Sequence, residues 1–360
     1  MTADELDRLR ARIRSLDGEI IALVAERVAL ARQVGERKQA QGLSTIDYAQ
    51  ERDVLDRARA RAESGGLDPG VAEELFAGLI RASVSAQEAD RVRMSAVGAG
   101  KRAVVVGGAG RMGRWMCRFL SAQGYETGAL DPAAEREENE WASRALASAE
   151  LVVCSTPPTA TAQLYASWEE SPPTGVVFDI ASIKTPLIGA IAALQRSGGR
   201  VASIHPMFGP SAVLLRGADV VICDTGDAAA TEAVERLFQP TSARLVPMPL
   251  ADHDRVMADL MSLAHGTAIA FALALPREEH PVRSTTFRAL ESLASAVVRE
   301  SPEVYFEIQT GNPHSADSLA RLAGALARLV EVLSSGEPER FRALFSEGQL
   351  RAPSVTRNEV

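Results

Sequence analysis

The segment Gly108–Gly113 reads Gly-Ala-Gly-Arg-Met-Gly and directly follows the apolar run 103–106. In a G-x-G-x-x-G turn between a strand and a helix, the first glycine allows the tight turn. The second lets the backbone approach a pyrophosphate, and the third lets helix and strand pack closely. Asp131 ends the next apolar run, where a carboxylate accepts from both ribose hydroxyls and repels a 2′-phosphate, so the pattern predicts NAD rather than NADP. The residues expected to hold this cofactor are Gly108, Gly110, Arg111, Met112, Gly113 and Asp131.

Two further strand ends carry polar groups of another kind. Ser182 and Lys184 follow the apolar run 176–180, and His205 follows the run 201–204. Ligands of parallel, doubly wound sheets bind at the carboxyl ends of the strands, so a hydroxyl, an ammonium and an imidazole are expected at one edge. A histidine there can act as a base or a hydrogen-bond acceptor near neutral pH. The sequence therefore predicts a reactive site beside the nucleotide.

Two cations interrupt an apolar helical stripe near the N-terminus. The stripe predicts a helix from about residue 4 to 39 and consists of Leu6, Leu9, Ile13, Leu16, Ile20, Leu23, Leu30 and Val34. Arg27 stands within the stripe, and Lys38 falls on the same face at roughly 100° per residue. A cation on an inward face is costly unless an anion meets it, either a protein carboxylate or a substrate. Arg10 lies about 100° off that face, which suits contact with a neighbouring subunit.

Two more helices are expected before the glycine segment. Asp47 is a good N-cap for a helix reaching about residue 62, and Pro69 suits the first turn of a third helix reaching about residue 92. Asp47 and Glu51 share a helix face, as do Ser83 and Gln87. Three helices without a strand, the first too long to pack on itself, predict a bundle completed by a second chain.

After the three helices, the pattern of apolar residues changes twice along the chain. Small residues from 95 to 100 form a linker, and helical patterns return from about 252 to 347. Between them, apolar runs alternate with helical patterns, as in a parallel, doubly wound α/β sheet. The expected strands are 103–106, 126–130, 151–155, 176–180, 201–204 and 219–223. We therefore expect three domains, at residues 1–93, 101–249 and 250–350.

The composition of the chain indicates which classes of partner to expect. The chain has 360 residues, of which 46% are hydrophobic, and a net charge of −8, which argues against nucleic acid or an anionic membrane as the main partner. Cys117, Cys154 and Cys223 lack metal-site spacing, so reduced thiols and no metal are expected. With no signal peptide and no uncharged run of transmembrane length, a cytoplasmic protein acting on small molecules is expected.

Residues from about 101 to 345 resemble prephenate dehydrogenases. The resemblance rests on the G-G-x-G-x-M-G loop, the D-x-A-S-x-K strand end at 179–184, the H-P-M-F-G-P segment at 205–210 and the helical domain that follows. It implies a Rossmann fold with a helical dimerisation domain, and oxidative decarboxylation of prephenate to 4-hydroxyphenylpyruvate with NAD. By resemblance, His205 bonds the ring 4-hydroxyl and accepts its proton, and Ser182 and Lys184 line the pocket.

The helical domain supplies further matches. By resemblance, Arg288 holds a prephenate carboxylate, and His265 is a further pocket histidine. A solvated helix charge at Arg288 and a structural core role for His265 are the alternatives. His253, His280 and His314 stand among charged or turn residues, and we expect them to be exposed.

Residues from about 4 to 92 resemble the all-helical chorismate mutases, which are intertwined dimers of three-helix subunits. The resemblance implies the Claisen rearrangement of chorismate to prephenate, without nucleophile or cofactor. The matching pocket positions are Arg10, Arg27, Lys38, Asp47, Glu51, Ser83 and Gln87. In that family, Arg10 of the partner and Arg27 clamp the carboxylates, Lys38 and Gln87 donate to the ether oxygen, and Glu51 accepts from the C4 hydroxyl.

One position departs from the mutase pattern and leaves the substrate open. Gln50 stands where the family usually has an arginine, which could weaken mutase activity or accommodate a C4 ammonium, as in 4-amino-4-deoxychorismate. The fused order resembles bifunctional chorismate mutase/prephenate dehydrogenases and predicts a homodimer. Three alternatives stay open: the same reactions on 4-amino substrates, a dehydrogenase with a non-catalytic helical dimerisation segment, and a binding protein whose nucleotide reports redox state.

Overall fold

The computed structural model describes residues 3–41, 47–276, 281–299 and 301–351. The chain forms two compact units. The first comprises residues 1–156, 170–180 and 197–247, and the second comprises 157–169, 181–196 and 248–360. Each unit is described separately below.

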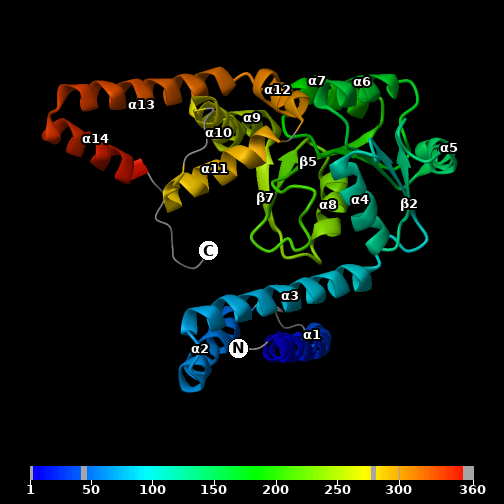
Figure 1. Cartoon of the computed structure of the whole chain (residues 1–360). Helices are drawn as coiled ribbons and strands as arrows, with labels where there is room; N and C mark the ends of the chain where they lie inside the picture. Colours follow the sequence, from blue (N-terminus) through cyan, green and yellow to red (C-terminus); the bar gives the residue numbers. More distant parts are fainter. Residues whose placement is uncertain (1–2, 42–46, 277–280, 300, 352–360) are drawn as a thin grey trace. The chain divides into compact units, whose positions relative to one another are not determined.

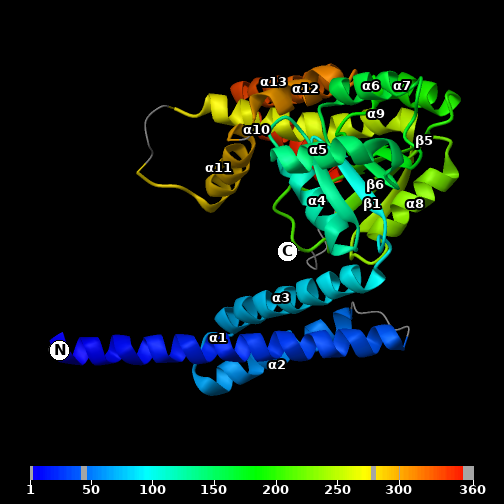
Figure 2. The same cartoon turned by 90° about the vertical axis from the view of Figure 1, so that its right-hand side faces the viewer.

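The first unit begins with the three predicted helices, α1 (Ala3–Ala40), α2 (Tyr48–Gly65) and α3 (Pro69–Ser95). Asp47 caps α2 as expected, because its side chain accepts from the backbone N–H of Gln50 at 3.1 Å. Asp68 accepts from the N–H of Gly70 at the start of α3, which carries Pro69 in its first turn. Figure 2 shows α1 as one long rod whose N-terminal end extends past α2 and α3.

Most of the apolar stripe of α1 is exposed in the single chain. Its exposed members are Leu9, Ile13, Leu16, Ile20, Leu23, Leu30 and Val34, and the neighbouring Ile21 is exposed as well. Apolar side chains that are 39–69% exposed along one face of a helix are unfavourable in water. A face of this kind is typical of a helix that packs against another surface.

A seven-stranded sheet with the order β2-β1-β3-β4-β5-β6-β7 completes the first unit (Figure 1). Its strands are β1 (Arg102–Val106), β2 (Glu126–Leu130), β3 (Leu151–Cys154), β4 (Val176–Asp179), β5 (Arg200–Pro206), β6 (Asp219–Asp224) and β7 (Arg244–Pro249). The strands from β2 to β5 are parallel, and β6 runs antiparallel to β5. The segment 207–218 contains no helix, so β6 returns beside β5 without the crossover that a parallel partner requires.

The core of this unit lies around the central strands. Val105, Phe178 and Ile204 are fully buried, as expected for strands covered on both faces. The helices α4 (Arg111–Ala122), α5 (Arg136–Ala145) and α8 (Ala228–Phe238) alternate with the strands. On α4, Trp115 and Phe119 stack with their ring centroids 4.9 Å apart.

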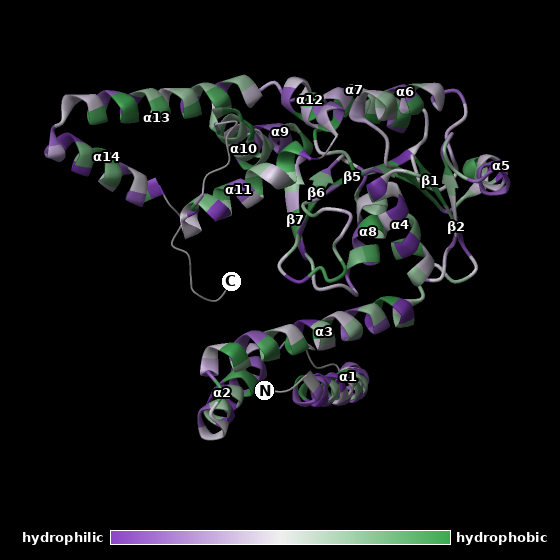
Figure 3. Ribbon diagram, viewed as in Figure 1, coloured by the Kyte–Doolittle hydropathy of each residue, from purple (hydrophilic) through white to green (hydrophobic). Residues whose placement is uncertain are grey.

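The second unit is helical. It contains α6 (Pro158–Ser167), α7 (Thr185–Arg196), α9 (His253–Met257), a π-helical turn (Ala258–Ser262), α10 (Leu263–Ala274), α11 (Thr285–Val298), α12 (Pro302–Gly311), α13 (Ser315–Ser335) and α14 (Pro338–Arg351). Apolar and polar residues alternate along α13 (Figure 3), where Leu326, Val330 and Leu333 remain exposed. The predicted fold class, helical bundle, then Rossmann-type sheet, then helices, is confirmed.

One stretch of the described chain, Leu250–Ala274, is long and apolar enough to cross a membrane by length and composition alone. It includes Asp254, which is buried, and Asp259, which pairs with Arg321 of α13. Helix α10 also packs against α11 and α13.

Candidate functional site

The glycine segment forms the turn between β1 and α4. Gly107 has a φ of 78°, which only glycine adopts without strain, and a Cβ on Gly113 would overlap the carbonyl oxygen of Gly107. Gly110 is the N-cap of α4 and has no side chain, so the first turn of α4 presents its N–H groups to an anion. Arg111 is exposed and Met112 half-buried in that turn.

Asp131 lies beside this glycine segment. Its carboxylate accepts from the N–H of Ala109 at 3.3 Å and from the N–H of Ala133 at 2.9 Å. A carboxylate held next to the phosphate-binding turn is in the position that receives the ribose of a dinucleotide. The residues predicted to hold the cofactor therefore fit one.

His205 lies near the carboxyl end of β5 and is 3% exposed. In the ladder with β6 it is opposite Val221. The segment after it is held by Trp115, whose indole N–H donates to the carbonyl of Ala212 at 2.9 Å and whose ring lies 4.9 Å from that of Phe208. His205 thus lies on a buried strand, directly before an anchored segment.

In the second unit, Lys184 is fully buried and its segment is held by Asp254. The backbone N–H groups of Lys184 and Thr185 each donate to one carboxylate oxygen of Asp254 at 2.7 Å. His253 Nδ1 lies 2.7 Å from the same carboxylate. Burial alone would raise the pKa of Asp254, but these hydrogen bonds outweigh it and lower the pKa to about 2. Ser182, two residues before Lys184, is half-buried.

The expectation that His253 is exposed is wrong, because its side chain is completely buried. Its charged neighbours in the sequence suggested a surface turn, yet Asp254 faces inward and binds the start of α7. His314 is half-buried rather than exposed, and His280 lies outside the described residues.

His265 and Arg288 lie on neighbouring helices, α10 and α11. The His265 ring meets the ring of Tyr305 edge to face, with centroids 4.7 Å apart, and burial lowers its pKa. Its Nδ1 atom is buried and has no hydrogen-bond partner within the described residues. Arg288 is exposed, and nothing in the described part of the chain joins its side chain to His265 by a hydrogen bond.

Four of the predicted mutase residues form two separate pairs, Arg27 with Ser83 and Lys38 with Asp47. Arg27 donates to Ser83 Oγ at 2.7 Å and to the carbonyl of Leu79 at 2.9 Å, and burial lowers its pKa. Lys38 Nζ lies 3.3 Å from Asp47 Oδ2. The pKa of Asp47 is lowered first by the backbone N–H of Gln50 and then by Lys38.

The three other predicted mutase residues, Gln87, Glu51 and Arg10, have contacts outside these two pairs. Gln87 donates to the carbonyl of Ala31 on α1 at 2.6 Å. Glu51 pairs with Arg216, a residue that the sequence did not indicate, at 2.7 Å. Arg10 is exposed, and its guanidinium lies 3.6 Å from the carboxylate of Asp7 on the same helix.

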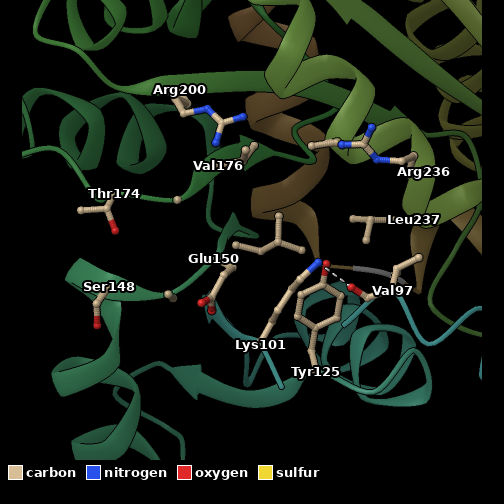
Figure 4. A pocket seen from close by; sticks show the side chains of 14 residues that line it. Val97, Lys101, Tyr125, Ser148, Glu150, Thr174, Val176, Arg200, Arg236 and Leu237 are labelled. Atoms are coloured by element: carbon tan, nitrogen blue, oxygen red, sulfur yellow. Dashed lines mark hydrogen bonds between the residues drawn. The ribbon is translucent and has the colours of Figure 1, made fainter. Parts of the chain in front are cut away.

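The described part of the first unit contains cavities beside α2 and α3, at the edge of the sheet and between α3 and α4. A cavity of about 680 Å³ beside Arg27 has a mainly apolar lining that includes Ala58, Ala62 and Phe76. Another, of about 330 Å³, lies at the amino ends of the strands, where Lys101, Glu150 and Arg236 surround it (Figure 4). None of the predicted site residues lines this second cavity, which is at the opposite edge of the sheet from the glycine turn.

Comparison with known families gives two matches. Residues 9–88 match the family of chorismate mutase type II, and residues 123–247 match the nucleotide-binding domain of prephenate dehydrogenase. The nucleotide cofactor expected from the sequence is thereby confirmed.

Individual relatives agree with both matches. The chain is 29% identical to a T-protein of Enterobacter agglomerans over 95% of this chain and 91% of that protein. It is 30% identical to a 4-amino-4-deoxyprephenate dehydrogenase of Streptomyces pristinaespiralis, over 68% of this chain and 89% of that protein. The fold also resembles that of a crystal structure of prephenate dehydrogenase from Aquifex aeolicus, which is 17% identical to this chain in sequence. The superposition covers 70% of this chain and 96% of that chain, with a TM-score of 0.56, which supports the fold. With a mutase segment ahead of a dehydrogenase segment, the chain belongs to the family of bifunctional chorismate mutase/prephenate dehydrogenases.

Proposed function

We propose that the chain rearranges chorismate to prephenate and then oxidises and decarboxylates prephenate to 4-hydroxyphenylpyruvate with NAD, in tyrosine biosynthesis. The single observation that carries the proposal is that one chain contains both residue sets, the cation-rich helical bundle and the glycine turn with His205 on its sheet. Relatives named T-protein match it over most of its length.

In the mutase site, the residues of the bundle bind and orient the substrate. Arg27 holds a carboxylate, and Arg10 of a second copy supplies the other clamp. Lys38 and Gln87 donate to the ether oxygen, where negative charge develops in the transition state, and Glu51 accepts from the C4 hydroxyl. Asp47 orients Lys38 through their 3.3 Å contact, and Ser83 orients Arg27.

In the dehydrogenase site, bound NAD supplies the acceptor for a hydride. His205 accepts the proton of the ring 4-hydroxyl, which must leave as the carbon is oxidised. Ser182 and Lys184 line the pocket, and Arg288 holds a carboxylate with the paired geometry that a guanidinium allows. His265 remains neutral because its pKa is lowered, so it can accept a hydrogen bond from the substrate.

The working protein in this proposal is a cytoplasmic homodimer acting on small molecules, with domains at residues 1–93, 101–249 and 250–350. The exposed apolar stripe of α1 supports the dimer, because a second α1 would cover it and would bring Arg10 to the partner's pocket. The exposed apolar residues of α13 give the C-terminal domain a second surface for the same partner.

A second candidate is the same pair of reactions on 4-amino-4-deoxychorismate and its product. Two observations favour it. The chain is 30% identical to a 4-amino-4-deoxyprephenate dehydrogenase, and Gln50 is neutral where the mutase family usually has an arginine.

A two-step assay distinguishes the candidates. The full chain is given NAD with either chorismate or 4-amino-4-deoxychorismate, and the aromatic product is identified by mass. We expect 4-hydroxyphenylpyruvate from chorismate with the higher kcat/KM. The control variant His205→Asn should stop after the first step and accumulate prephenate. Formation of NADH from prephenate but no consumption of either mutase substrate would overturn the bifunctional assignment.

A further inference from the structure

An arginine of the sheet-containing part of the first unit reaches the carboxylate of Glu51. Arg216 Nη1 donates to Glu51 Oε1 at 2.7 Å, and its guanidinium carbon lies 4.9 Å from the ring centre of Tyr48. Both side chains of the pair are only about a fifth exposed, at 23% for Arg216 and 22% for Glu51. The pair joins positions 165 residues apart, from the β5–β6 connection to α2.

The backbone on both sides of Arg216 is anchored. Leu215 is 2% exposed, and its N–H donates to the buried carboxylate of Glu88 at 2.9 Å. The other oxygen of Glu88 accepts from the N–H of Ser242 at 2.8 Å. Gly217, with a φ of 75°, and the hydrogen bond from Ala218 to Leu215 close a tight turn after it. Because Glu88 directly follows Gln87 on α3, the arginine is held by the helix that also carries a mutase residue.

The contact changes the charge that a substrate would meet at Glu51. A free carboxylate attracts an ammonium group strongly and accepts a hydrogen bond from a hydroxyl. A carboxylate that is already paired with a guanidinium still accepts a hydrogen bond from a hydroxyl. An ammonium group placed beside the same carboxylate is repelled by the positive charge of the arginine. The hydrogen bond to Glu51 also raises the pKa of Arg216, so its charge persists throughout the working pH range.

We propose that Arg216 is a specificity-determining residue of the mutase site, which through Glu51 selects a C4 hydroxyl over a C4 ammonium. This rests on the proposed function, in which Glu51 contacts the C4 substituent. Arg216 thus supplies from the β5–β6 connection the positive charge that Gln50 does not supply from α2. It acts as a positioning residue, because its contact is to Glu51.

The test compares two substrates in the full chain. Mutase kcat/KM is measured for chorismate and for 4-amino-4-deoxychorismate in the wild type, Arg216→Ala and Arg216→Lys, with prephenate oxidation measured in each. Arg244→Ala is the matched control, because Arg244 pairs with Asp219 at 2.6 Å in the same unit and its side chain is 75% exposed. Arg216→Ala should shift the ratio of the two kcat/KM values toward the amino substrate by about tenfold, the size expected for a like-charge contact in a partly exposed site.

Arg216→Lys should recover most of the hydroxyl preference, and Arg244→Ala should leave the ratio unchanged. An unchanged ratio in Arg216→Ala would overturn the inference while leaving the proposed function intact. So would an equal loss of mutase and dehydrogenase activity in Arg216→Ala, because that is the result of a structural role. Absence of mutase turnover on both substrates in the wild type would overturn the proposed function and this inference with it.

Discussion

Replacing Asp254 by Asn tests how the dehydrogenase half holds Lys184. The carboxylate of Asp254 accepts from two backbone N–H groups and lies 2.7 Å from His253 Nδ1. An amide keeps one acceptor oxygen but turns an N–H₂ group toward a backbone N–H. The variant therefore loses the charge and leaves a buried donor without an acceptor.

The size of the effect follows from the pKa. Its fall from an ordinary 3.8 to about 2 corresponds to about 2.5 kcal/mol of unfolding free energy at neutral pH. Because the folded pKa is the lower one, this stabilisation is fully present above about pH 4 and is lost as the pH falls through about 2. With the unpaired donor, we expect Asp254→Asn to lower stability by about 3 kcal/mol at pH 7, or roughly 6–12 °C in Tm.

The assay is thermal unfolding of the full chain between pH 7 and pH 2.5, followed by circular dichroism. Asp252→Asn is the control, because Asp252 is half exposed and pairs with Arg255 on the surface at 3.3 Å. The difference in Tm between wild type and Asp254→Asn should shrink markedly by pH 2.5, and prephenate oxidation should fall while mutase activity holds. A difference below about 1 kcal/mol at pH 7, or one that is as large at pH 2.5 as at pH 7, would refute the reasoning.

Three further predictions concern the two sites. His205→Asn should lower prephenate oxidation by about 10²–10⁴-fold and leave mutase activity near normal, measured by NADH formation and chorismate consumption; equal loss of both would contradict its role as base. Asp131→Ala should weaken NAD binding by about tenfold or more and favour NADP relative to NAD, as measured by calorimetry, and unchanged NAD affinity would count against the ribose contact. Arg27→Ala should lower mutase kcat/KM by about tenfold to a hundredfold without changing prephenate oxidation, and full mutase activity would exclude Arg27 as a carboxylate clamp.

Local sequence patterns predicted the helix starts and the glycine turn well, because neighbouring residues determine these features. The N-cap at Asp47, the helix start at Pro69 and the glycine turn before Arg111 depend on residues within one helical turn of each other. The antiparallel return of β6 and the strand β7 escaped the sequence interpretation. Strand direction depends on how the 207–218 connection packs, and β7 has the weakly patterned sequence Arg-Leu-Val-Pro-Met-Pro.

The environments of single polar residues were harder to predict. His253 was expected at the surface because charged residues flank it, but its burial depends on Asp254 binding a helix that starts 69 residues earlier in the chain. Arg27 contacts Ser83 of α3, as an inward-facing cation would, although most of the apolar stripe around it is exposed in the single chain.

The sequence by itself determined which reactions to expect from the chain. The reason is that the glycine turn, the H-P-M-F-G-P segment and the cation-bearing stripe are each recognised from residues close together along one element. Only the tertiary structure decided which distant groups meet, such as Arg216 with Glu51 and Asp254 with the start of α7. The physical reason is that a charged side chain reaches only a few ångströms. Its partner is therefore chosen by the packing of helices and loops far apart in the chain, which no local pattern records.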